Sequence, residues 1–595
     1  MKERTERKMI KTGIIVFAAA VSTLLYAQNA DFAVEKSKKV IKFGWDAPTP
    51  GFMEQNFEQI EKNMTAFDGM SIEFNSTTAK RNGRAAGSGA MFFDSWRWEK
   101  SDFQKEIESL KKVNARFRNL KHNFINTNSM AAVKDRFDWF DDRMWETITH
   151  NFALMAAIAR ETGCRGLNLD IENYERQTFL YNPNLGHTYA ETWDKARQRG
   201  REFITAIAGA YPDIVLHTFF WLDQHYVNAD GVVSPYDKSE KWIMGLSLAF
   251  INGIYDALPE GVTIVEGMES AGYRARSRAD YESILATRWK KSRWLIDPKN
   301  YEKFLRRTQI GIATYLDRYI VTDPKSIWYI SENPDRNLAL LRECMTSACA
   351  AADEYVWVWG EKRAWYPWQF QGWMKKSAES VNRPGPLWED ALPGISQAIL
   401  YAKAPQQYYK NVILSGKLGR NLLRNGNFAE AGESSAGDLP PDTAFLKTAR
   451  PWGCWQDSRS KGRFEVVRGL GRGGTPAVKI SGVTNGCILQ SPPFRPDGTY
   501  YIRARVKCEG KASASLSLGW TDAAGRWNFW GFNRAAAFSR ELPDGWREAE
   551  ILLTADMIPP EAKGISVQIS VKSPGGAEDV CIADEIEFYN LNQIQ

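Results

Sequence analysis

The stretch CRGLNLDIE, residues 164–172, decides the fold of the longer, N-terminal part of this chain. Apolar and polar residues alternate along it, as along a β-strand whose successive side chains point to opposite faces. One face holds apolar side chains, those of Leu167, Leu169 and Ile171. The other face holds polar side chains, those of Asn168, Asp170 and Glu172. This pattern indicates a sheet that packs against helices on one side and encloses polar groups on the other.

Seven similar runs flank this stretch, and helical patterns separate them. Strands that alternate with helices build a parallel sheet, and eight such units close a (β/α)8 TIM barrel. An open doubly wound sheet uses the same units and is the alternative, but no glycine-rich phosphate turn follows the first run. The other runs are VIKFGWD (40–46), FDGMSIEFN (67–75), LKHNFINT (120–127), DIVLHTFFW (213–221), VTIVEGME (262–269), TQIGIATYL (308–316) and EYVWVWGE (354–361).

After about residue 416 the pattern changes to alternating strands separated by Gly and Pro turns, without long amphipathic helices. In YYIRARVKC, residues 500–508, every second residue is apolar or aromatic, and residues 565–571 repeat the pattern. Such a series predicts an all-β jelly-roll sandwich. We therefore expect a signal peptide over residues 1–30, the barrel over 31–415 and the sandwich over 416–595.

Composition excludes several classes of protein. The 595 residues are 44% hydrophobic and 25% charged, which is typical of globular domains. The net charge of +6 is too small for this length to indicate a nucleic-acid partner. A basic start precedes the apolar run GIIVFAAAVSTLLYA, residues 13–27, as in an export signal, so we expect a secreted or periplasmic protein. A retained membrane anchor is the alternative, although the run is short for a membrane span.

Cofactor chemistry finds no support in the sequence. The seven cysteines form no C-x-x-C pair, and the five histidines have no metal-ligand spacing. We therefore expect no catalytic cofactor and mostly buried free thiols.

In a (β/α)8 barrel the reactive groups lie at the carboxyl ends of the strands, where acidic residues gather in this sequence. Asp170 and Glu172 are two acids on one face, which raises the proton affinity of each. We expect Glu172, nearer the barrel mouth, to act as a general acid with Asp170 assisting it. A two-carboxylate mechanism would add a second acid, Glu361 first and Glu269 second. A salt bridge at the barrel rim is the alternative for each acid.

Aromatic and polar residues at the strand ends suggest a ligand with flat C–H faces and hydroxyl groups, that is, a carbohydrate. The chain has 23 tryptophans, and about half of those near strand ends are expected in ordinary barrel packing. The candidates for substrate contact are Trp45, Asp46, Glu73, Asn126, Asn168, Trp221, Tyr315, Asp317, Trp357 and Trp359. Trp45, Trp221 and Trp359 are the expected stacking platforms.

RGLNLDIEN, residues 165–173, resembles the fourth-strand signature D-x-x-D-x-D-x-E of family 18 chitinases, and that of family 85 endo-β-N-acetylglucosaminidases, where an Asn-x-Glu pair ends the strand. The last two acids of the chitinase motif match Asp170 and Glu172, whereas its earlier acids fall on Arg165 and Asn168. The resemblance implies a glycosidase in which Glu172 protonates the leaving oxygen and Asp170 orients the acetamido group of the substrate. The two departures motivate an alternative, a catalytically silent carbohydrate-binding protein. A polysaccharide lyase or a transglycosylase is a third interpretation.

The C-terminal domain resembles jelly-roll carbohydrate-binding modules of families 4, 9 and 22, which open with a motif like LLRNGNFAE (422–430) and close with one like IADEIEFY (582–589). The resemblance implies a polysaccharide or glycan partner, with Trp520, Trp527 and Trp530 as a stacking face. It also implies a structural calcium near Glu430 and Asp584. A purely structural domain is the alternative.

Overall fold

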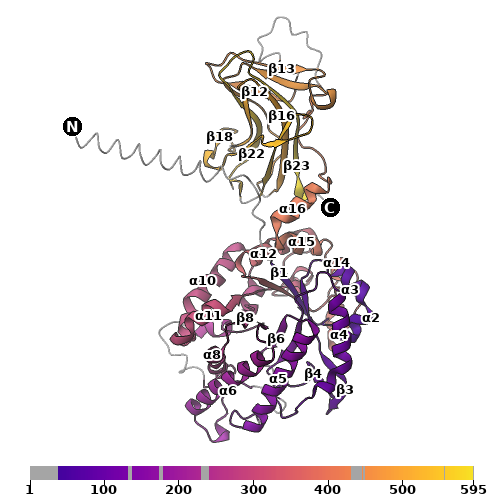
Figure 1. Cartoon of the computed structure of the whole chain (residues 1–595), viewed down its shortest axis with the longest axis vertical. Coiled ribbons are helices and arrows are strands. Elements are labelled where there is room, and N and C mark those ends of the chain that lie inside the picture. Colours follow the sequence, from indigo (N-terminus) through magenta and orange to yellow (C-terminus); the bar gives the residue numbers. More distant parts are fainter. Residues whose placement is uncertain are drawn as a thin grey trace, which may run out of the picture. The chain divides into compact units, whose positions relative to one another are not determined.

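The computed structural model describes residues 38–131, 137–172, 178–228, 240–430, 445, 449–496, 498–554, 557–559 and 561–593. The predicted signal peptide, residues 1–30, lies outside these ranges. The chain divides into two compact units, Met1–Tyr408 and Tyr409–Gln595 (Figure 1).

Within the described ranges, nine strands form the central sheet of the first unit, in the order β10-β11-β1-β2-β5-β6-β7-β8-β9. All neighbouring strands are parallel, as the alternation of strands and helices predicted. β9 pairs with β8, and β10 pairs with β11; only Gly311 separates β9 from β10. The chain itself therefore joins the two ends of a nearly closed, barrel-like sheet. The strands are β1 (Lys39–Gly44), β2 (Gly69–Ile72), β5 (Phe124–Asn128), β6 (Gly166–Asp170), β7 (Val215–Thr218), β8 (Thr263–Glu266), β9 (Thr308–Ile310), β10 (Ile312–Tyr315) and β11 (Tyr355–Gly360).

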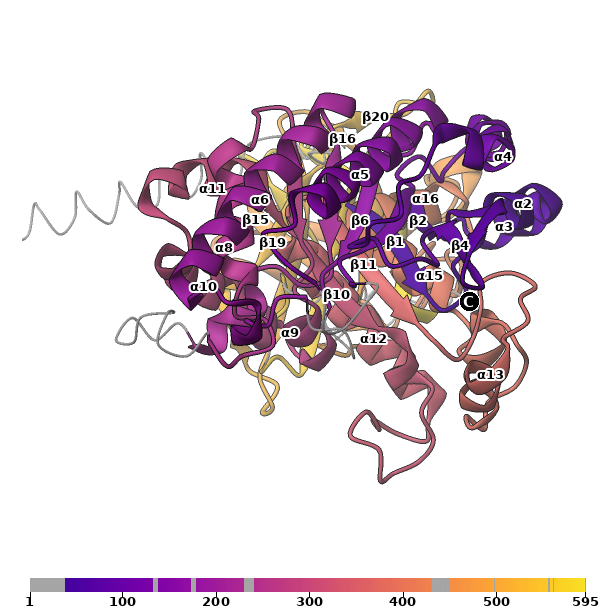
Figure 2. The same cartoon turned by 90° about the horizontal axis from the view of Figure 1, so that it is seen from below.

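Helices surround these strands (Figure 2). α5 shows why the sequence folds this way: Asp141 caps its start, Gly163 ends it with φ of 76°, and one apolar face is buried. A hairpin of β3 (Asn75–Arg81) and β4 (Arg84–Gly87), which the sequence pattern did not predict, follows β2. The helices are α2 (Pro50–Gln55), α3 (Phe57–Asn63), α4 (Gln104–Arg116), α5 (Asp142–Thr162), α6 (Tyr189–Ala210), α8 (Ser247–Ala257), α9 (Glu269–Arg274), α10 (Arg278–Leu295), α11 (Tyr301–Arg307), α12 (Pro334–Ala351), α13 (Gly372–Glu379), α14 (Trp388–Ala391), α15 (Ile395–Lys403) and α16 (Pro405–Leu414).

Aromatic rings fill the inside of the barrel-like sheet. Phe43 of β1 contacts His217 of β7 and Trp357 of β11, at ring-centroid distances of 4.8 and 5.5 Å. Asn168 lies at the same level, because its Oδ1 is 3.3 Å from Nδ1 of His217. This contact places Asn168 on the inner face of β6, and the alternation of the strand puts Asp170 on the same face.

The second unit is a sandwich of antiparallel sheets, which confirms the predicted all-β character of this region. One sheet has the order β12-β15-β22-β17-β18, with β19 paired to β17, and the other has the order β13-β14-β23-β16-β21-β20. Buried apolar residues of β16 and β22 meet in its core, as their alternation predicted. The strands are β12 (Gly453–Gln456), β13 (Arg463–Val467), β14 (Ala477–Ser481), β15 (Asn485–Gln490), β16 (Tyr500–Glu509), β17 (Ser513–Thr521), β18 (Trp527–Asn528), β19 (Arg534–Ala537), β20 (Arg540–Glu541), β21 (Arg547–Leu553), β22 (Gly564–Lys572) and β23 (Val580–Asn590).

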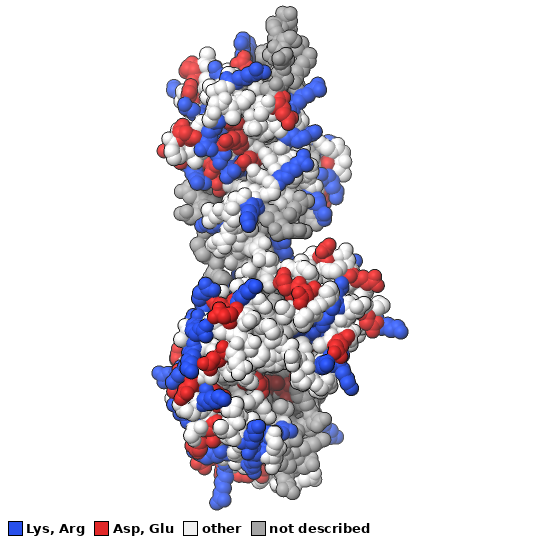
Figure 3. Space-filling view, turned by 90° about the vertical axis from the view of Figure 1, so that its right-hand side faces the viewer, with Lys and Arg blue, Asp and Glu red and all other residues white. Residues whose placement is uncertain are grey.

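Surface charge is mixed. Basic and acidic side chains are interspersed on the face drawn in Figure 3. None of the helices in the described ranges is both long enough and apolar enough to span a membrane.

Candidate active site

Four acidic residues lie at the carboxyl end of the barrel-like sheet. Asp170 is the last residue of β6, and Glu172 follows two residues later. The main-chain N–H of Glu172 donates to Oδ1 of Asp170 at 2.8 Å, which fixes the turn after the strand. Burial raises the pKa of Asp170 to about 7, and the charge of Glu172 adds to the rise. Asp170 therefore takes up or releases a proton near neutral pH.

Glu269, the first residue of α9, holds its proton even more firmly. Burial raises the pKa of Glu269 to about 9, and the charges of Glu172, Asp170, Asp223 and Glu361 raise it further. These four residues come from the ends of three strands, β6, β7 and β11, and each lies within electrostatic reach of Glu269. The structure thus brings together all four predicted catalytic acids.

In the described part of the chain, no lysine or arginine forms an ion pair with Asp170, Glu269 or Glu361. Neighbouring carboxyl groups without a cation favour the protonated form, because each charge repels the next. The raised pKa values of Asp170 and Glu269 therefore allow these two groups to hold protons near neutral pH.

Glu361 follows β11, and its carboxylate has a fixed orientation. Tyr315 donates its hydroxyl to Oε2 at 3.1 Å, and Trp359 donates its indole N–H to Oε1 at 2.9 Å. The main-chain N–H groups of Glu361 and Lys362 donate to the carboxylate of Asp317 at 2.8 and 2.9 Å. Burial raises the pKa of Asp317 to about 7, with a contribution from the charge of Glu361. Tyr315 and Asp317, both predicted as substrate contacts, thus position Glu361.

Two members of the cluster were not among the predicted site residues. Asp223 follows β7 and is half-buried, and its Oδ1 accepts the main-chain N–H of Trp221 at 2.9 Å. Desolvation raises the pKa of Asp223 to about 7. Tyr273 stacks on Tyr315 with ring centroids 5.0 Å apart. The sequence signals were present: Asp223 follows the fifth run, and Tyr273 lies one helical turn after Glu269.

Glu266, only three residues before Glu269, has a different environment. It is fully buried at the end of β8, and Arg288 donates to its Oε2 at 2.8 Å in an ion pair. Tyr226 donates its hydroxyl to Oε1 at 2.9 Å. All its partners belong to the protein framework, so Glu266 is a structural acid.

Several predicted contact residues lie at the mouth of the sheet. Trp45 and Trp359 are half-buried, and Trp45 meets Trp373 of α13 edge to face at 4.7 Å. Burial raises the pKa of Glu73, which accepts a hydrogen bond from the side-chain amide of Asn75 at 3.1 Å. The side chains of Asn75 and Asn126 partly offset this rise in the pKa of Glu73. These groups surround the acids with aromatic and amide surface.

Other predicted contact residues have a placement that differs from the expected one. Asp46 is fully buried and forms an ion pair with Lys42 of β1. Trp221 is 1% exposed and donates its indole N–H to Tyr255 of α8 at 2.9 Å. Trp357 is also buried, and its indole N–H donates to the carbonyl of Gly267 at 2.8 Å. These three side chains belong to the packing of the fold, as does Asn168 beside His217.

In the second unit, exposed aromatic residues lie on the outer face of the β12–β18 sheet. Trp527 and Trp530 are 42% and 65% exposed and stack with centroids 6.4 Å apart. Trp527 covers Gly519, where a Cβ atom would come within 2.5 Å of the indole ring. Trp455, on the opposite edge strand, is 54% exposed. Trp520 differs from its expected role, because it is buried and its indole N–H donates to the carbonyl of Phe532 at 3.0 Å.

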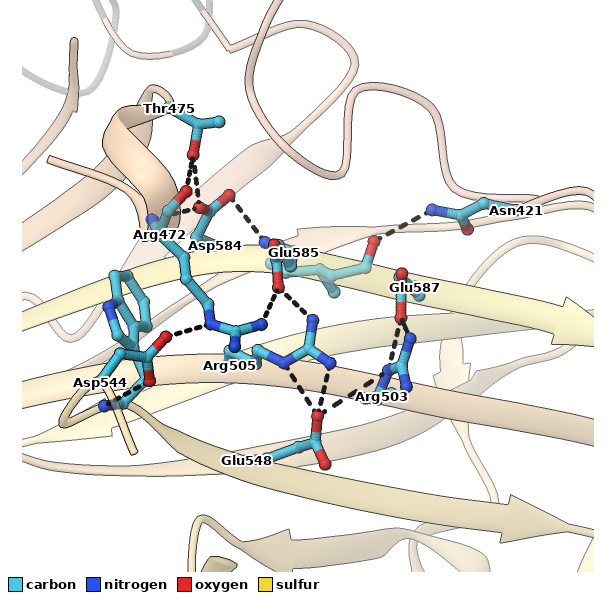
Figure 4. Close-up of polar contacts among 12 residues, drawn as sticks. Asn421, Arg472, Thr475, Arg503, Arg505, Asp544, Glu548, Asp584, Glu585 and Glu587 are labelled. Carbon is cyan, nitrogen blue, oxygen red and sulfur yellow. Dashed lines mark hydrogen bonds and ion pairs between the residues drawn. The ribbon is translucent and has the colours of Figure 1, made fainter. Parts of the chain in front are cut away.

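The other sheet of the sandwich carries charges that pair with each other (Figure 4). Arg505 lies between Glu548, at 2.7 Å, and Glu585. Arg503 pairs with Glu587 at 2.5 Å, and a further ion pair joins Arg472 to an aspartate, Asp544. Each arginine in this group contacts at least one carboxylate, so the group is an internally balanced network.

The predicted calcium site does not fit this arrangement. Both oxygens of Asp584 already accept hydrogen bonds, Oδ1 from the N–H of Glu585 at 2.7 Å and Oδ2 from the N–H of Arg472 and the hydroxyl of Thr475, both at 2.9 Å. Glu430 is exposed. Among the described residues, no three His, Cys, Asp or Glu side chains are grouped so that they could hold a metal ion.

Comparison with known proteins gives only partial matches. No protein-family model and no curated protein matches the chain. Among solved structures, a family 61 carbohydrate-binding module in complex with β-1,4-galactotriose shares 18% identity at a TM-score of 0.19, over 29% of this chain and 99% of that one. The CBM22-1–GH10 modules of Clostridium thermocellum endo-1,4-β-D-xylanase 10B share 16% identity at 0.19, over 23% and 26%. An arabinose-bound GH51 α-L-arabinofuranosidase shares 14% identity at 0.21, over 29% and 27%. The chain thus spans about a quarter of the length of these two hydrolases.

Proposed function

We propose that this protein is an exported glycoside hydrolase and that the acid cluster at the carboxyl end of a (β/α)8-type barrel is its active site. The observation that supports this most directly is the crowding around Glu269, whose pKa is raised to about 9 among four other acids that follow or end strands of the sheet. Glycoside hydrolysis requires one carboxyl group that still holds a proton at the working pH and a second group that assists at the sugar carbon. Half-buried tryptophans around the acids suit a sugar ring.

In the mechanism that we propose first, Glu172 is the proton donor. The proton moves to the glycosidic oxygen as the C–O bond breaks, and the leaving sugar departs with a new hydroxyl group. Water then adds its oxygen to the sugar carbon and returns a proton to Glu172. Asp170, with a pKa near 7 and a hydrogen bond to the main chain of Glu172, holds a proton or a substrate amide beside the reacting bond.

A two-carboxylate mechanism is the second candidate, and the protonation of Glu269 favours it. Glu269 would donate the proton, and Glu361 would act as nucleophile or as water-activating base. The hydroxyl of Tyr315 and the indole of Trp359 already hold the Glu361 carboxylate in one orientation. Such fixed orientation is what an attacking group requires.

For the second unit we propose carbohydrate binding on the aromatic face formed by Trp455, Trp527 and Trp530. Exposed indole rings at the two edges of one sheet face can stack on the flat sides of a sugar chain. Serine and glutamine side chains of β17 and β22 share that face with Trp527, because Gln568 Nε2 lies within reach of the Gly519 position that the ring covers. These groups offer hydrogen bonds to sugar hydroxyls.

The test is reducing-end release from a panel of polysaccharides and glycans, with wild type beside Glu172→Gln, Glu269→Gln and Glu361→Gln. Removing a general acid lowers turnover by about 10²- to 10⁴-fold. We expect this loss in Glu172→Gln, whereas a loss confined to Glu269→Gln and Glu361→Gln would select the two-carboxylate mechanism. Glu302→Gln is the control, because Glu302 is an exposed residue of α11 whose side chain is 91% accessible.

Other product patterns would contradict the proposal. Sugar binding without any reducing ends from any glycan would identify a silent carbohydrate-binding protein. An unsaturated product would identify a lyase, and products longer than the substrate would identify a transglycosylase.

A further inference from the structure

A groove of about 740 Å³ lies along α13 in the first unit, which is large enough for a small ligand. Its lining has an excess of positive charge. Four basic residues, Lys362, Arg363, Lys375 and Arg383, face one acidic residue, Glu379. Of these, Lys375 lies 3.9 Å from Glu379, and the described part of the chain provides no carboxylate partner for the other three. The residues that line the groove therefore carry a net positive charge.

Arg363 is the buried member of this group, with an exposure of 5%. Its guanidinium donates to four main-chain carbonyls, those of Lys362, Ala378, Val381 and Arg383, at 2.7 to 3.2 Å. These bonds fix the wall of the groove, and the carboxylates that act on the charge of Arg363, those of Asp317 and Asp390, do not line it. Its Nε has no hydrogen-bond partner among the described residues, and neither has Nε of Arg383. Both Nε atoms are buried, so the basic groups that a ligand in the groove can reach are the more exposed side chains of Lys362, Lys375 and Arg383.

The groove adjoins the acid cluster. Lys362 follows Glu361 directly in the chain, and its ammonium group donates to the hydroxyl of Ser377 in α13 at 3.2 Å. The same helix presents Trp373 to Trp45 at the mouth of the sheet. Half-buried aromatic rings, those of Trp368 and Phe370, line the groove beside the basic groups. A sugar bound there would meet both a stacking surface and a cation.

We propose that this groove binds the anionic group of an acidic sugar, a carboxylate or a sulfate ester, so that the substrate of the enzyme is an acidic glycan. Only the statement that this glycan is the substrate rests on the proposed function. Binding of the acidic sugar in the groove does not require turnover. The basic groups also offset the repulsion that the acid cluster would exert on an anionic chain. The aromatic walls and the open form of the groove suit a sugar ring that carries an anionic group better than they suit a free inorganic ion.

The experiment measures the dissociation constants of full-length Glu172→Gln protein for three tetrasaccharide probes. They are tetragalacturonate, its fully methyl-esterified form and a sulfated galactan tetrasaccharide. The ester has the same backbone without the charge, and the sulfated probe separates the two anionic groups. We expect tetragalacturonate or the sulfated probe to bind at least about tenfold more tightly than the ester, with a preference that weakens as salt rises. Equal binding of all three probes, or no binding of either acidic probe, would overturn the proposal.

Variants connect the preference to the groove. In Lys375→Gln/Arg383→Gln we expect the preference for the charged probe to fall about tenfold. The control is Lys376→Gln, a neighbouring exposed lysine of α13 that does not line the groove. Because Lys375 is exposed, Lys375→Gln alone keeps the fold intact and should lose part of the preference. An unchanged preference in both groove variants would overturn the proposal. Groove-dependent binding without cleavage of any glycan would instead refute the proposed function, whereas cleavage of neutral glycans alone would refute only this inference.

Discussion

Two groups of carboxylates in this molecule have opposite surroundings. On the β16–β21–β23 face of the second unit, Glu548, Glu585 and Glu587 each contact an arginine (Figure 4). At the mouth of the barrel-like sheet, Asp170 and Glu269 lie beside other acids, and their pKa values are raised to about 7 and about 9. The first arrangement stabilises ionised carboxylates, whereas the second makes ionisation costly.

The difference separates structural acids from chemical ones. A paired carboxylate contributes to the fold and offers no proton at neutral pH. A crowded carboxyl group lowers stability at neutral pH, and such a cost is typical of sites that need a perturbed pKa. Glu266 and Glu269 show the same contrast over three residues, because Glu266 pairs with Arg288 and Glu269 faces other acids.

The largest effect should follow from Glu266→Gln. This change leaves the guanidinium of Arg288, whose side chain is 6% exposed, without its carboxylate. Breaking one partner of a buried ion pair costs about 3–5 kcal/mol. Denaturant unfolding of the full chain checks this value in the transition of the first unit. A loss below about 1 kcal/mol would show that Glu266 is not the structural acid of this pair.

Much of the fold could be predicted because the runs of buried residues are long and regular. Each of the eight predicted runs contains a strand of the barrel-like sheet, the seventh one being split into β9 and β10 at Gly311. Alternation along residues 164–172 also placed Asn168 and Asp170 on the inner face, as the His217 contact shows. The β3–β4 hairpin was missed, because its polar strands lack the apolar pattern of buried ones.

A smaller effect of opposite sign is expected for Glu269→Gln. Unfolded glutamic acid loses its proton near pH 4.3, whereas the folded chain keeps the Glu269 proton to about pH 9. The folded state therefore binds more protons between these values, and its stability falls as the pH rises. Glutamine removes this penalty, which the full shift would set at about 5 kcal/mol at pH 8. Glu269 is only half-buried, and solvent screening lowers the expected gain in stability of the variant to about 2 kcal/mol at pH 8, with no difference near pH 4. Differential scanning calorimetry at the two pH values tests this. Equal stability at pH 8 would mean that Glu269 is paired after all.

The pH dependence of hydrolysis should reveal the titration of Asp170. If protonated Asp170 assists Glu172, kcat/KM falls about tenfold per pH unit once the pH exceeds about 7. In Asp170→Asn the side chain no longer titrates, so this falling limb of the profile of kcat/KM against pH should disappear from the residual activity. A limb that stays near pH 7 in the variant would assign it to another group, such as Asp223 or Asp317, whose pKa values are also raised to about 7.

The candidate site was less predictable than the fold, because partners from distant helices determine each side chain's environment. Trp221 follows its strand as a platform residue would, yet Tyr255 of α8 binds its indole in the interior. Arg288, which neutralises Glu266, lies on α10, and the alternation of residues along a strand cannot predict a partner on a helix. The acids could be predicted as a group because every parallel strand ends at the same edge of the sheet.

The smallest effect should follow from Asp544→Asn, on the paired face of the second unit. Its ion pair with Arg472 is partly open to solvent, with side-chain exposures of 33% for Arg472 and 40% for Asp544. Glu585 remains as a second partner for Arg472 at 3.3 Å. Solvent screening makes such a pair weak, and the cost of its loss should shrink further in high salt. Urea unfolding at low and high salt measures it, with Glu548→Gln, whose carboxylate is 2% exposed, as the buried counterpart expected to cost more. An equal loss in the free energy of unfolding for the two variants would mean that burial does not determine how much these ion pairs stabilise the fold. The distinction between paired and crowded acids would then depend on the barrel residues alone.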